Sequence, residues 1–295
     1  MTAPFGRVLT AMVTPFASDG SIDLKRAAEL AQRLVDDGND GLVISGTTGE
    51  ASTTTDAERE ELLREVVGAV GDRAHVVAGV GSNDTAHSVA LTQAAEKAGA
   101  AGVLVVTPYY NKPPQAGVIA HVEAVVAAAE LPVMLYDIPG RAGIAMTTDT
   151  IVRLAEHERV VAMKDAKLDL EATSWVLARS DLSYYSGDDS WTLPVLAVGG
   201  VGVVGTSTHV VAGRTQQLVA AFVRGDLAEA RALHTGLLPI FSGIFRTQGT
   251  ILVKAALEIL GFPVGGVRLP LVPATDAERA QLREDLVAAG VEVPA

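Results

Sequence analysis

Short apolar runs alternate along the chain with amphipathic stretches. The runs lie at residues 7–14, 41–45, 75–79, 102–106, 132–137, 160–165, 182–187 and 201–206. Between them, segments such as 27–38, 56–70 and 85–99 place charged and apolar residues at helical spacing. Strands without a polar face that alternate with helices are typical of a parallel sheet covered on both sides. About eight such units predict a closed (β/α)8 barrel.

The last part of the chain lacks apolar runs of the strand type. It contains further helical patterns, of which 252–260 and 276–290 are the clearest. No linker or low-complexity stretch separates this part from the rest. We therefore predict a catalytic barrel over residues 1–225 and a C-terminal helical extension over residues 226–295.

The ends of several predicted helices carry recognisable signals. Asp56 and Thr85 are candidate N-cap residues, because their side chains can accept hydrogen bonds from free backbone N–H groups. Gly38 and Gly99 follow their helices where a left-handed residue often ends the last turn.

Composition limits the classes of function. The net charge of -12 argues against nucleic-acid or anionic-membrane binding, because the chain has no basic surplus to neutralise phosphates. The absence of cysteine excludes disulfides, thiolate nucleophiles and cysteine-ligated metals. The first residues lack a basic region followed by an apolar core and a cleavage site, so we expect no signal peptide and a cytoplasmic protein.

One uncharged run, residues 193–213, is long enough to span a bilayer. Its glycines and its Ser/Thr cluster favour a helix, a buried strand and a loop in succession. We therefore expect no membrane span.

Lys164 closes the apolar run 160–165 and is an unusual residue for that place. In a barrel of this class the strand ends form the catalytic face. Burial there would lower the lysine pKa, and a neutral amine is a nucleophile toward carbonyl groups. Position alone favours the plainer alternative of a solvated lysine or one paired with Asp165, since perturbed lysines are rare. We expect Lys167 to be an exposed loop residue.

Polar clusters follow other predicted strands at the same rim: 46–52, 107–113, 136–141 and 186–189. Tyr136 could shuttle protons to an imine, or it could be an amphipathic residue at a strand end. Arg141 could bind a carboxylate with two hydrogen bonds, or it could be a surface arginine.

Two patterns could be mistaken for cofactor or metal sites. GVGVVG (200–205) matches a dinucleotide motif, but it falls in the last predicted strand, so it indicates close backbone packing. The histidines show no metal-binding spacing, and Asp188 and Asp189 are more typical of a structural turn. We expect no cofactor and no metal.

Taken together, GTTGE, TPYYNKP, YDIPGR, VAMKDAK and SGDD occur in an order and at spacings that resemble the dihydrodipicolinate synthase family of class I, pyruvate-dependent aldolases. The resemblance covers nearly the whole chain. It implies pyruvate and aspartate 4-semialdehyde as substrates and a homo-oligomer, at least a dimer and more typically a tetramer.

The resemblance also implies roles for individual residues. Lys164 would form the imine with pyruvate. Tyr136, Thr47 and Tyr110 match the proton relay, in which Tyr110 comes from the neighbouring subunit. The other matches are substrate-binding positions: Thr48 for the pyruvate carboxylate, Arg141 for the semialdehyde carboxylate, and Gly187 and Val204 for the backbone that lines the pocket.

Two further matches bear on regulation. Arg59 and His87 stand where lysine-inhibited members of the family have a histidine and a glutamate, whereas Asn83 and Tyr109 are retained. We therefore expect weak or absent inhibition by lysine. The sequence departs from the family pattern at Ala51 and in the segment GVVGTSTH of the predicted eighth strand. Neither departure removes a catalytic group.

Two other functions are compatible with parts of this pattern. One is a sister aldolase that acts on a sugar acid, such as an N-acetylneuraminate lyase, and Arg141 argues against it. The other is a catalytically dead barrel that serves as a binding protein, and the intact pair of Lys164 and Tyr136 argues against it.

Overall fold

A computed structural model describes residues 3–294 of the chain. Within these residues, eight parallel strands close into a barrel in the order β1 to β8, and β1 pairs with β8. The strands are β1 (Val8–Ala11), β2 (Gly41–Ile44), β3 (His75–Gly79), β4 (Gly102–Val106), β5 (Val133–Asp137), β6 (Val160–Asp165), β7 (Ser183–Ser186) and β8 (Gly202–Gly205). The predicted (β/α)8 fold is confirmed.

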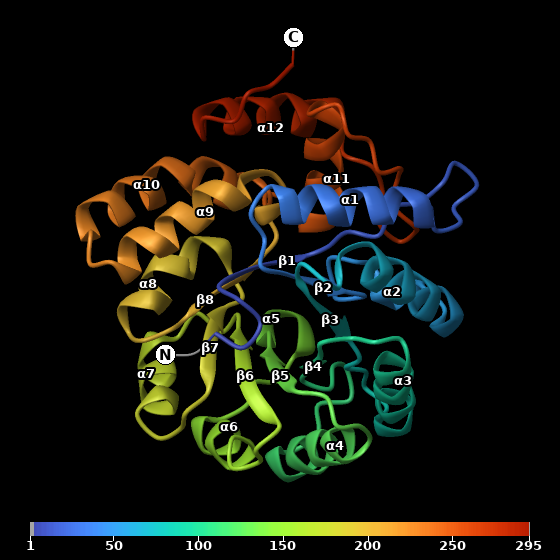
Figure 1. Cartoon of the computed structure of the whole chain (residues 1–295), viewed down its shortest axis with the longest axis vertical. Helices are drawn as coiled ribbons and strands as arrows, with labels where there is room; N and C mark the ends of the chain where they lie inside the picture. Colours follow the sequence, from blue (N-terminus) through green and yellow to red (C-terminus); the bar gives the residue numbers. More distant parts are fainter. Residues whose placement is uncertain (1–2, 295) are drawn as a thin grey trace.

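Helices surround the barrel (Figure 1). They are α1 (Leu24–Asp36), α2 (Asp56–Val70), α3 (Thr85–Lys97), α4 (Gln115–Ala127), α5 (Pro139–Ala142), α6 (Thr148–Leu154), α7 (Leu170–Leu177), α8 (Thr192–Ala197) and α9 (Thr208–Val223). Two short 3-10 helices, η1 (Ala51–Thr53) and η2 (Asp189–Trp191), follow β2 and β7.

Three further helices, α10 (Leu227–Gly243), α11 (Gly249–Ile259) and α12 (Asp276–Ala288), form the C-terminal extension. They lie together at one side of the barrel, beside α1 and α9 (Figure 1). The expected extension is thus present, whereas the division of the chain at residue 225 stays a prediction.

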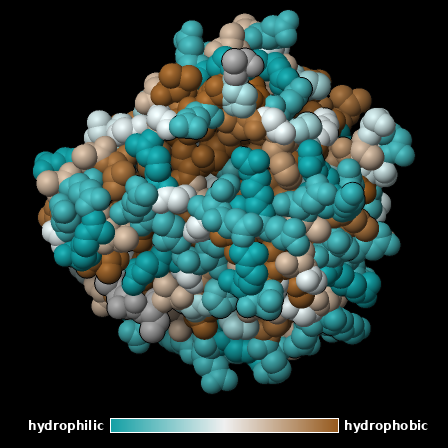
Figure 2. Space-filling view, turned by 45° about the horizontal axis from the view of Figure 1, so that its top comes forward, coloured by the Kyte–Doolittle hydropathy of each residue, from teal (hydrophilic) through white to brown (hydrophobic). Residues whose placement is uncertain are grey.

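The strands separate two apolar clusters because successive side chains point to opposite faces of the sheet. The smaller cluster fills the barrel with residues such as Leu9, Val43, Met134 and Tyr185. The larger one packs between the strands and the helices. The outer surface is mostly hydrophilic, with hydrophobic residues gathered in a hollow near the top of the view (Figure 2).

The two N-cap predictions are wrong by one residue each. Thr55 caps α2, and Asp84 caps α3. Asp56 and Thr85 are already the first helical residues, whereas a cap needs the extended backbone that Thr55 and Asp84 adopt.

The two predicted helix ends are confirmed. Gly38 and Gly99 lie just beyond α1 and α3, with left-handed φ angles of 106° and 83°. Their N–H groups donate to the carbonyls of Val35 at 3.0 Å and Glu96 at 3.1 Å, so each glycine closes the last turn of its helix.

The run 193–213 contributes to α8, β8 and the first turns of α9. Within residues 3–294, none of the helices combines the length and the apolar character that crossing a bilayer requires. The location of the protein in the cell stays a prediction.

Candidate active site

A cavity of about 880 Å³ opens at the carboxyl ends of the strands. Four of the predicted site residues line it: Thr47, Tyr110, Tyr136 and Arg141. Gly79, Leu104 and Val106 contribute parts of its wall from β3 and β4, and Gly81 contributes from the segment after β3. The other predicted residues, Lys164, Thr48, Gly187 and Val204, lie outside the lining of this cavity.

Lys164 lies directly beside the cavity wall formed by Tyr136. The two residues are partners in the register of β5 and β6, and the lysine Nζ is 4.3 Å from the centre of the tyrosine ring. Lys164 is 6% exposed and follows Ala162 of the inner cluster on the same side of β6. The alternative of a solvated lysine therefore does not hold.

The pKa of Lys164 is lowered from its ordinary value to about 8. Burial is the main cause, because a low-polarity environment disfavours the ammonium form. The carboxylate of Asp189 opposes this shift, and the positive charge of Arg141 adds to it. A substantial fraction of the lysine is therefore a neutral amine at mildly alkaline pH.

Tyr136 stays protonated near neutral pH. Burial raises the pKa of its phenol to about 12, although Arg141 and a hydrogen bond with the Thr47 side chain act in the opposite direction. The hydrogen bond joins the end of β5 to the loop after β2. The hydroxyl can thus give a proton to a group on Lys164 and receive one through Thr47.

Arg141 lies in the short helix α5, and its side chain is exposed at the cavity. Gly143 ends this helix with φ 80°, a left-handed conformation in which a side chain would be strained. The free guanidinium can bind a carboxylate with two hydrogen bonds above the lysine and the tyrosine.

Tyr110 protrudes from the loop after β4 and is 88% exposed. Its φ of 73° is unusual for a residue with a side chain, and its N–H donates to the Ala142 carbonyl at 3.3 Å. An exposed aromatic ring on a constrained backbone is better suited to contact another molecule than to fill this chain's own core.

Three remaining predicted residues are held by backbone contacts and close packing. The Thr48 carbonyl accepts a hydrogen bond of 3.0 Å from the Thr250 hydroxyl. The Gly187 N–H donates to the Asp165 carbonyl at 2.7 Å. Val204 is fully buried in the inner cluster.

The expectation that Lys167 is exposed is wrong. Its Nζ lies 3.4 Å from Asp137 Oδ2 and 3.2 Å from Asp165 Oδ2, and its side chain is almost fully buried. Asp137 and Asp165 directly follow Tyr136 and Lys164, so they point to the opposite face of the sheet. This cluster ties the ends of β5 and β6 together behind the reacting side chains.

Asp188 and Asp189 have structural partners. Asp188 caps η2 by accepting from Ser190, and Asp189 accepts from the N–H groups of Thr206 and Ser207. Sequence reasoning missed the influence of Asp189 on the pKa of Lys164, because Lys164 lies in β6 and Asp189 lies in η2, after the next strand.

GVGVVG packs closely, as the sequence predicted. A side chain on Gly202 would meet the Arg7 carbonyl at 1.8 Å, and one on Gly205 would meet the Asp189 carboxylate at 2.5 Å. In the described part of the chain, no group of three or more His, Asp or Glu side chains is arranged to hold a metal ion.

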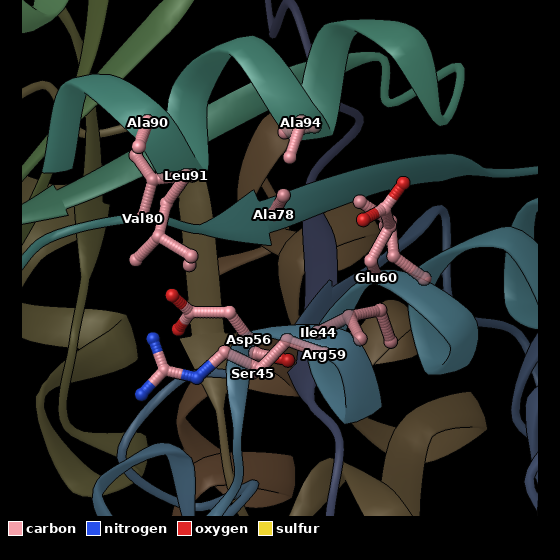
Figure 3. Close-up of a pocket in the computed structure, with 13 residues that line it drawn as sticks. Ile44, Ser45, Asp56, Arg59, Glu60, Ala78, Val80, Ala90, Leu91 and Ala94 are labelled. Carbon is pink, nitrogen blue, oxygen red and sulfur yellow. The ribbon is translucent and has the colours of Figure 1, made fainter. Parts of the chain in front are cut away.

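A second, smaller cavity of about 210 Å³ lies between α2, α3 and the strands beneath them (Figure 3). Apolar side chains such as Leu91 line most of it, whereas Asp56, Arg59 and Glu60 stand on α2. Arg59 borders both cavities, and Figure 3 shows its guanidinium near the Asp56 carboxylate. Asp56 Oδ1 also forms a hydrogen bond of 2.9 Å with His87 Nε2.

Comparisons with known proteins point to one family. The model of the dihydrodipicolinate synthetase family matches residues 4–289. The 4-hydroxy-tetrahydrodipicolinate synthase of Acidothermus cellulolyticus is 67% identical, with coverage of 98% of this chain and 94% of the relative. A Streptomyces coelicolor protein named 4-hydroxy-tetrahydrodipicolinate synthase 2 is 59% identical, with coverage of 98% and 97%.

The fold is also closely similar to that of a solved structure. The crystal structure of DHDPS from Cyanidioschyzon merolae with lysine bound superimposes with a TM-score of 0.97 at 43% identity. The match covers 99% of this chain and 100% of that one.

Proposed function

Because this chain belongs to the dihydrodipicolinate synthetase family, we propose that it condenses pyruvate with L-aspartate 4-semialdehyde through an imine on Lys164. The chain is a lyase of the class I aldolase type, and its activity is that of a 4-hydroxy-tetrahydrodipicolinate synthase in lysine and diaminopimelate biosynthesis. The observation that carries the mechanism is the buried amine of Lys164, 4.3 Å from the centre of the ring of the protonated Tyr136.

The proposed reaction has three stages. The neutral Lys164 amine adds to the ketone carbon of pyruvate, and loss of water gives a protonated imine. Its positive charge draws electrons, so a methyl proton leaves and an enamine forms. The enamine carbon attacks the aldehyde carbon of the semialdehyde, and the semialdehyde amino group then displaces Lys164 as the ring closes.

The surrounding residues move protons and orient the substrates. The proposed relay consists of Tyr136, Thr47 and a partner's copy of Tyr110. It delivers the proton that the hydroxyl group needs in order to leave as water when the imine forms. The backbone at three positions would surround the pyruvate: Thr48 at the carboxylate, with Gly187 and Val204 beside it. These steps are carbonyl and acid–base chemistry, so the proposal includes no cofactor.

A coupled assay tests the activity. Purified protein with both substrates should yield product, whereas N-acetylneuraminate alone should release no pyruvate. Release of pyruvate from the sugar acid, without turnover of the semialdehyde, would replace the proposal by the sister aldolase activity.

Arg141→Ala is expected to impair use of the semialdehyde. Loss of a charge-assisted contact costs about 1.5–3 kcal/mol, so kcat/KM for this substrate should fall about 10- to 150-fold. Trapping of pyruvate by borohydride should survive, because Lys164 is intact. Arg153→Ala, on the remote helix α6, is the matched control and should change neither quantity. If Arg141→Ala lost the trapping of pyruvate but used the semialdehyde as before, the role given to Arg141 would be wrong.

The active protein is expected to be a tetramer. We assign one contact surface to the exposed Tyr110 and a second to Leu168 and Trp175, which are 45% and 57% exposed near α7. Two separate surfaces fit a dimer of dimers, which is the arrangement that closed symmetry favours for a tetramer. Light scattering should give about four times the 30.5 kDa chain mass. A fully active monomer at the assay concentration would exclude the shared Tyr110.

Lysine is expected to inhibit weakly or not at all. The lysine ammonium would meet the guanidinium of Arg59, which already donates to Thr54 Oγ1 at 3.3 Å. His87 is engaged by Asp56 and offers no carboxylate. With substrates near KM, lysine should need millimolar concentrations to act.

A paired substitution provides the control for this expectation. Arg59→His together with His87→Glu should increase sensitivity to lysine, because it removes the competing cation and adds an acceptor. Strong inhibition of the unaltered protein below millimolar lysine would contradict the assignment of these two positions.

A further inference from the structure

The loop after β2 carries Thr47 and Thr48, and its conformation is set by contacts from distant parts of the chain. Thr47 lines the cavity, whereas the next three residues are not part of the lining and are held by other elements. The Gly49 carbonyl accepts from the buried Thr14 hydroxyl at 2.6 Å. The Thr48 carbonyl accepts from Thr250, in the first turn of α11.

Glu50 ends this loop as a buried carboxylate. It is 3% exposed and has φ 56°, a left-handed conformation that is unfavourable for a residue with a side chain. Its N–H donates to the Thr47 carbonyl at 3.2 Å. A carboxylate kept in a strained backbone and removed from water requires strong compensating partners.

Both oxygens of Glu50 find those partners in the C-terminal extension. Oε1 lies 2.7 Å from Lys254 Nζ on α11, and Oε2 accepts from the Arg268 N–H at 2.8 Å. Lys254 is itself only 4% exposed and is further satisfied by the Gly266 carbonyl at 2.6 Å and the Phe16 ring at 4.2 Å. Both charges of this pair are therefore neutralised inside the protein and not by solvent.

We propose that Glu50 and Lys254 are positioning residues, through which the C-terminal extension fixes the loop that binds the pyruvate carboxylate. The inference rests on the proposed function, because it takes from it the roles of Thr47 and Thr48. Neither Glu50 nor Lys254 lines the cavity, so their effect on the reaction passes through the backbone of residues 47–49.

The test is a comparison of the two Michaelis constants in Lys254→Met and in Lys254→Met combined with Glu50→Gln. A misplaced loop should raise the pyruvate KM about tenfold or more and leave the semialdehyde KM unchanged, because Arg141 lies in α5, apart from this loop. The single variant leaves the buried Glu50 carboxylate without the positive charge of Lys254, so this variant should also unfold at a lower temperature. The double variant should recover stability without recovering the pyruvate KM.

Thr250→Val is a gentler variant that keeps the side-chain shape and removes only the hydrogen bond to the Thr48 carbonyl. It should fold and raise the pyruvate KM by about fivefold, the effect of one ordinary hydrogen bond. Asp285→Asn is the matched control, since it breaks the ion pair with Arg246, also in the extension, without reaching the loop. It should lower the melting temperature and leave both Michaelis constants unchanged.

The outcomes separate this inference from the proposed function. Unchanged pyruvate KM in the folded Lys254 and Thr250 variants, beside an active unaltered protein, would overturn the positioning role alone. Recovery of both stability and pyruvate KM in the double variant would also overturn it, because the pair would then act only in folding. An unaltered protein without synthase activity would instead refute the proposed function.

Discussion

Replacement of Lys164 by methionine is expected to abolish trapping of pyruvate by borohydride and to lower turnover at least about a thousandfold. Methionine fills a similar volume without an amine, so the loss reports chemistry and not a cavity. In the unaltered protein, mass spectrometry should find reduced pyruvate on the peptide that contains Lys164. Lys112→Met is the matched control, because this exposed lysine lines the same cavity and its loss should leave trapping intact. Trapping that persists without Lys164 would place the nucleophile elsewhere.

The pH dependence of imine formation provides a second check on the same amine. With a pKa of about 8, roughly a tenth of Lys164 is neutral at pH 7 and most of it is neutral at pH 9. The rate of trapping should therefore rise through pH 8 and then level off. In Arg141→Ala the midpoint should move to higher pH, because Arg141 contributes to lowering the lysine pKa. A rate that still rises above pH 10 would indicate an unperturbed, solvated lysine.

The alternation of apolar runs and helices was sufficient to predict the barrel. Parallel strands buried on both faces occur mainly in α/β folds, and eight strand–helix units in succession favour the closed form, whose strand ends meet at one rim. For this reason Thr47, Tyr136 and Arg141 could be placed around one site from the sequence. The position of Lys164 alone does not distinguish a catalytic lysine from a solvated or ion-paired one. The family resemblance of the neighbouring motifs indicates the catalytic role.

Contacts between distant loops could not be predicted. Lys254 and Glu50 are separated by 204 positions, and nothing in either segment indicates a buried ion pair. Lys167 does lie in the loop after β6, but its burial could not be predicted, because its two carboxylate partners lie on the face of β5 and β6 that points away from the site. One missed feature did have a local signal: Thr55 and Glu58 form a capping box, a spacing that identifies the true start of α2.

Tyr136→Phe is expected to lower kcat about 10²- to 10⁴-fold, the usual contribution of a positioned proton donor. The ring remains over the Lys164 amine, so packing is retained while the hydroxyl and its bond with Thr47 are lost. Because the phenol pKa is about 12, Tyr136 enters the reaction protonated, and the variant should lose the step in which water leaves.

The control for this variant lies inside the same barrel. Tyr185 pairs with Lys164 in the register of β6 and β7, but its hydroxyl donates to the Gly6 carbonyl at 2.8 Å. Tyr185→Phe should therefore cost about 1 kcal/mol of stability and leave kcat unchanged. Stopped-flow measurement of imine formation should show a slow step in Tyr136→Phe alone. If both variants lost turnover equally, packing inside the barrel, and not proton transfer through Tyr136, would be the cause.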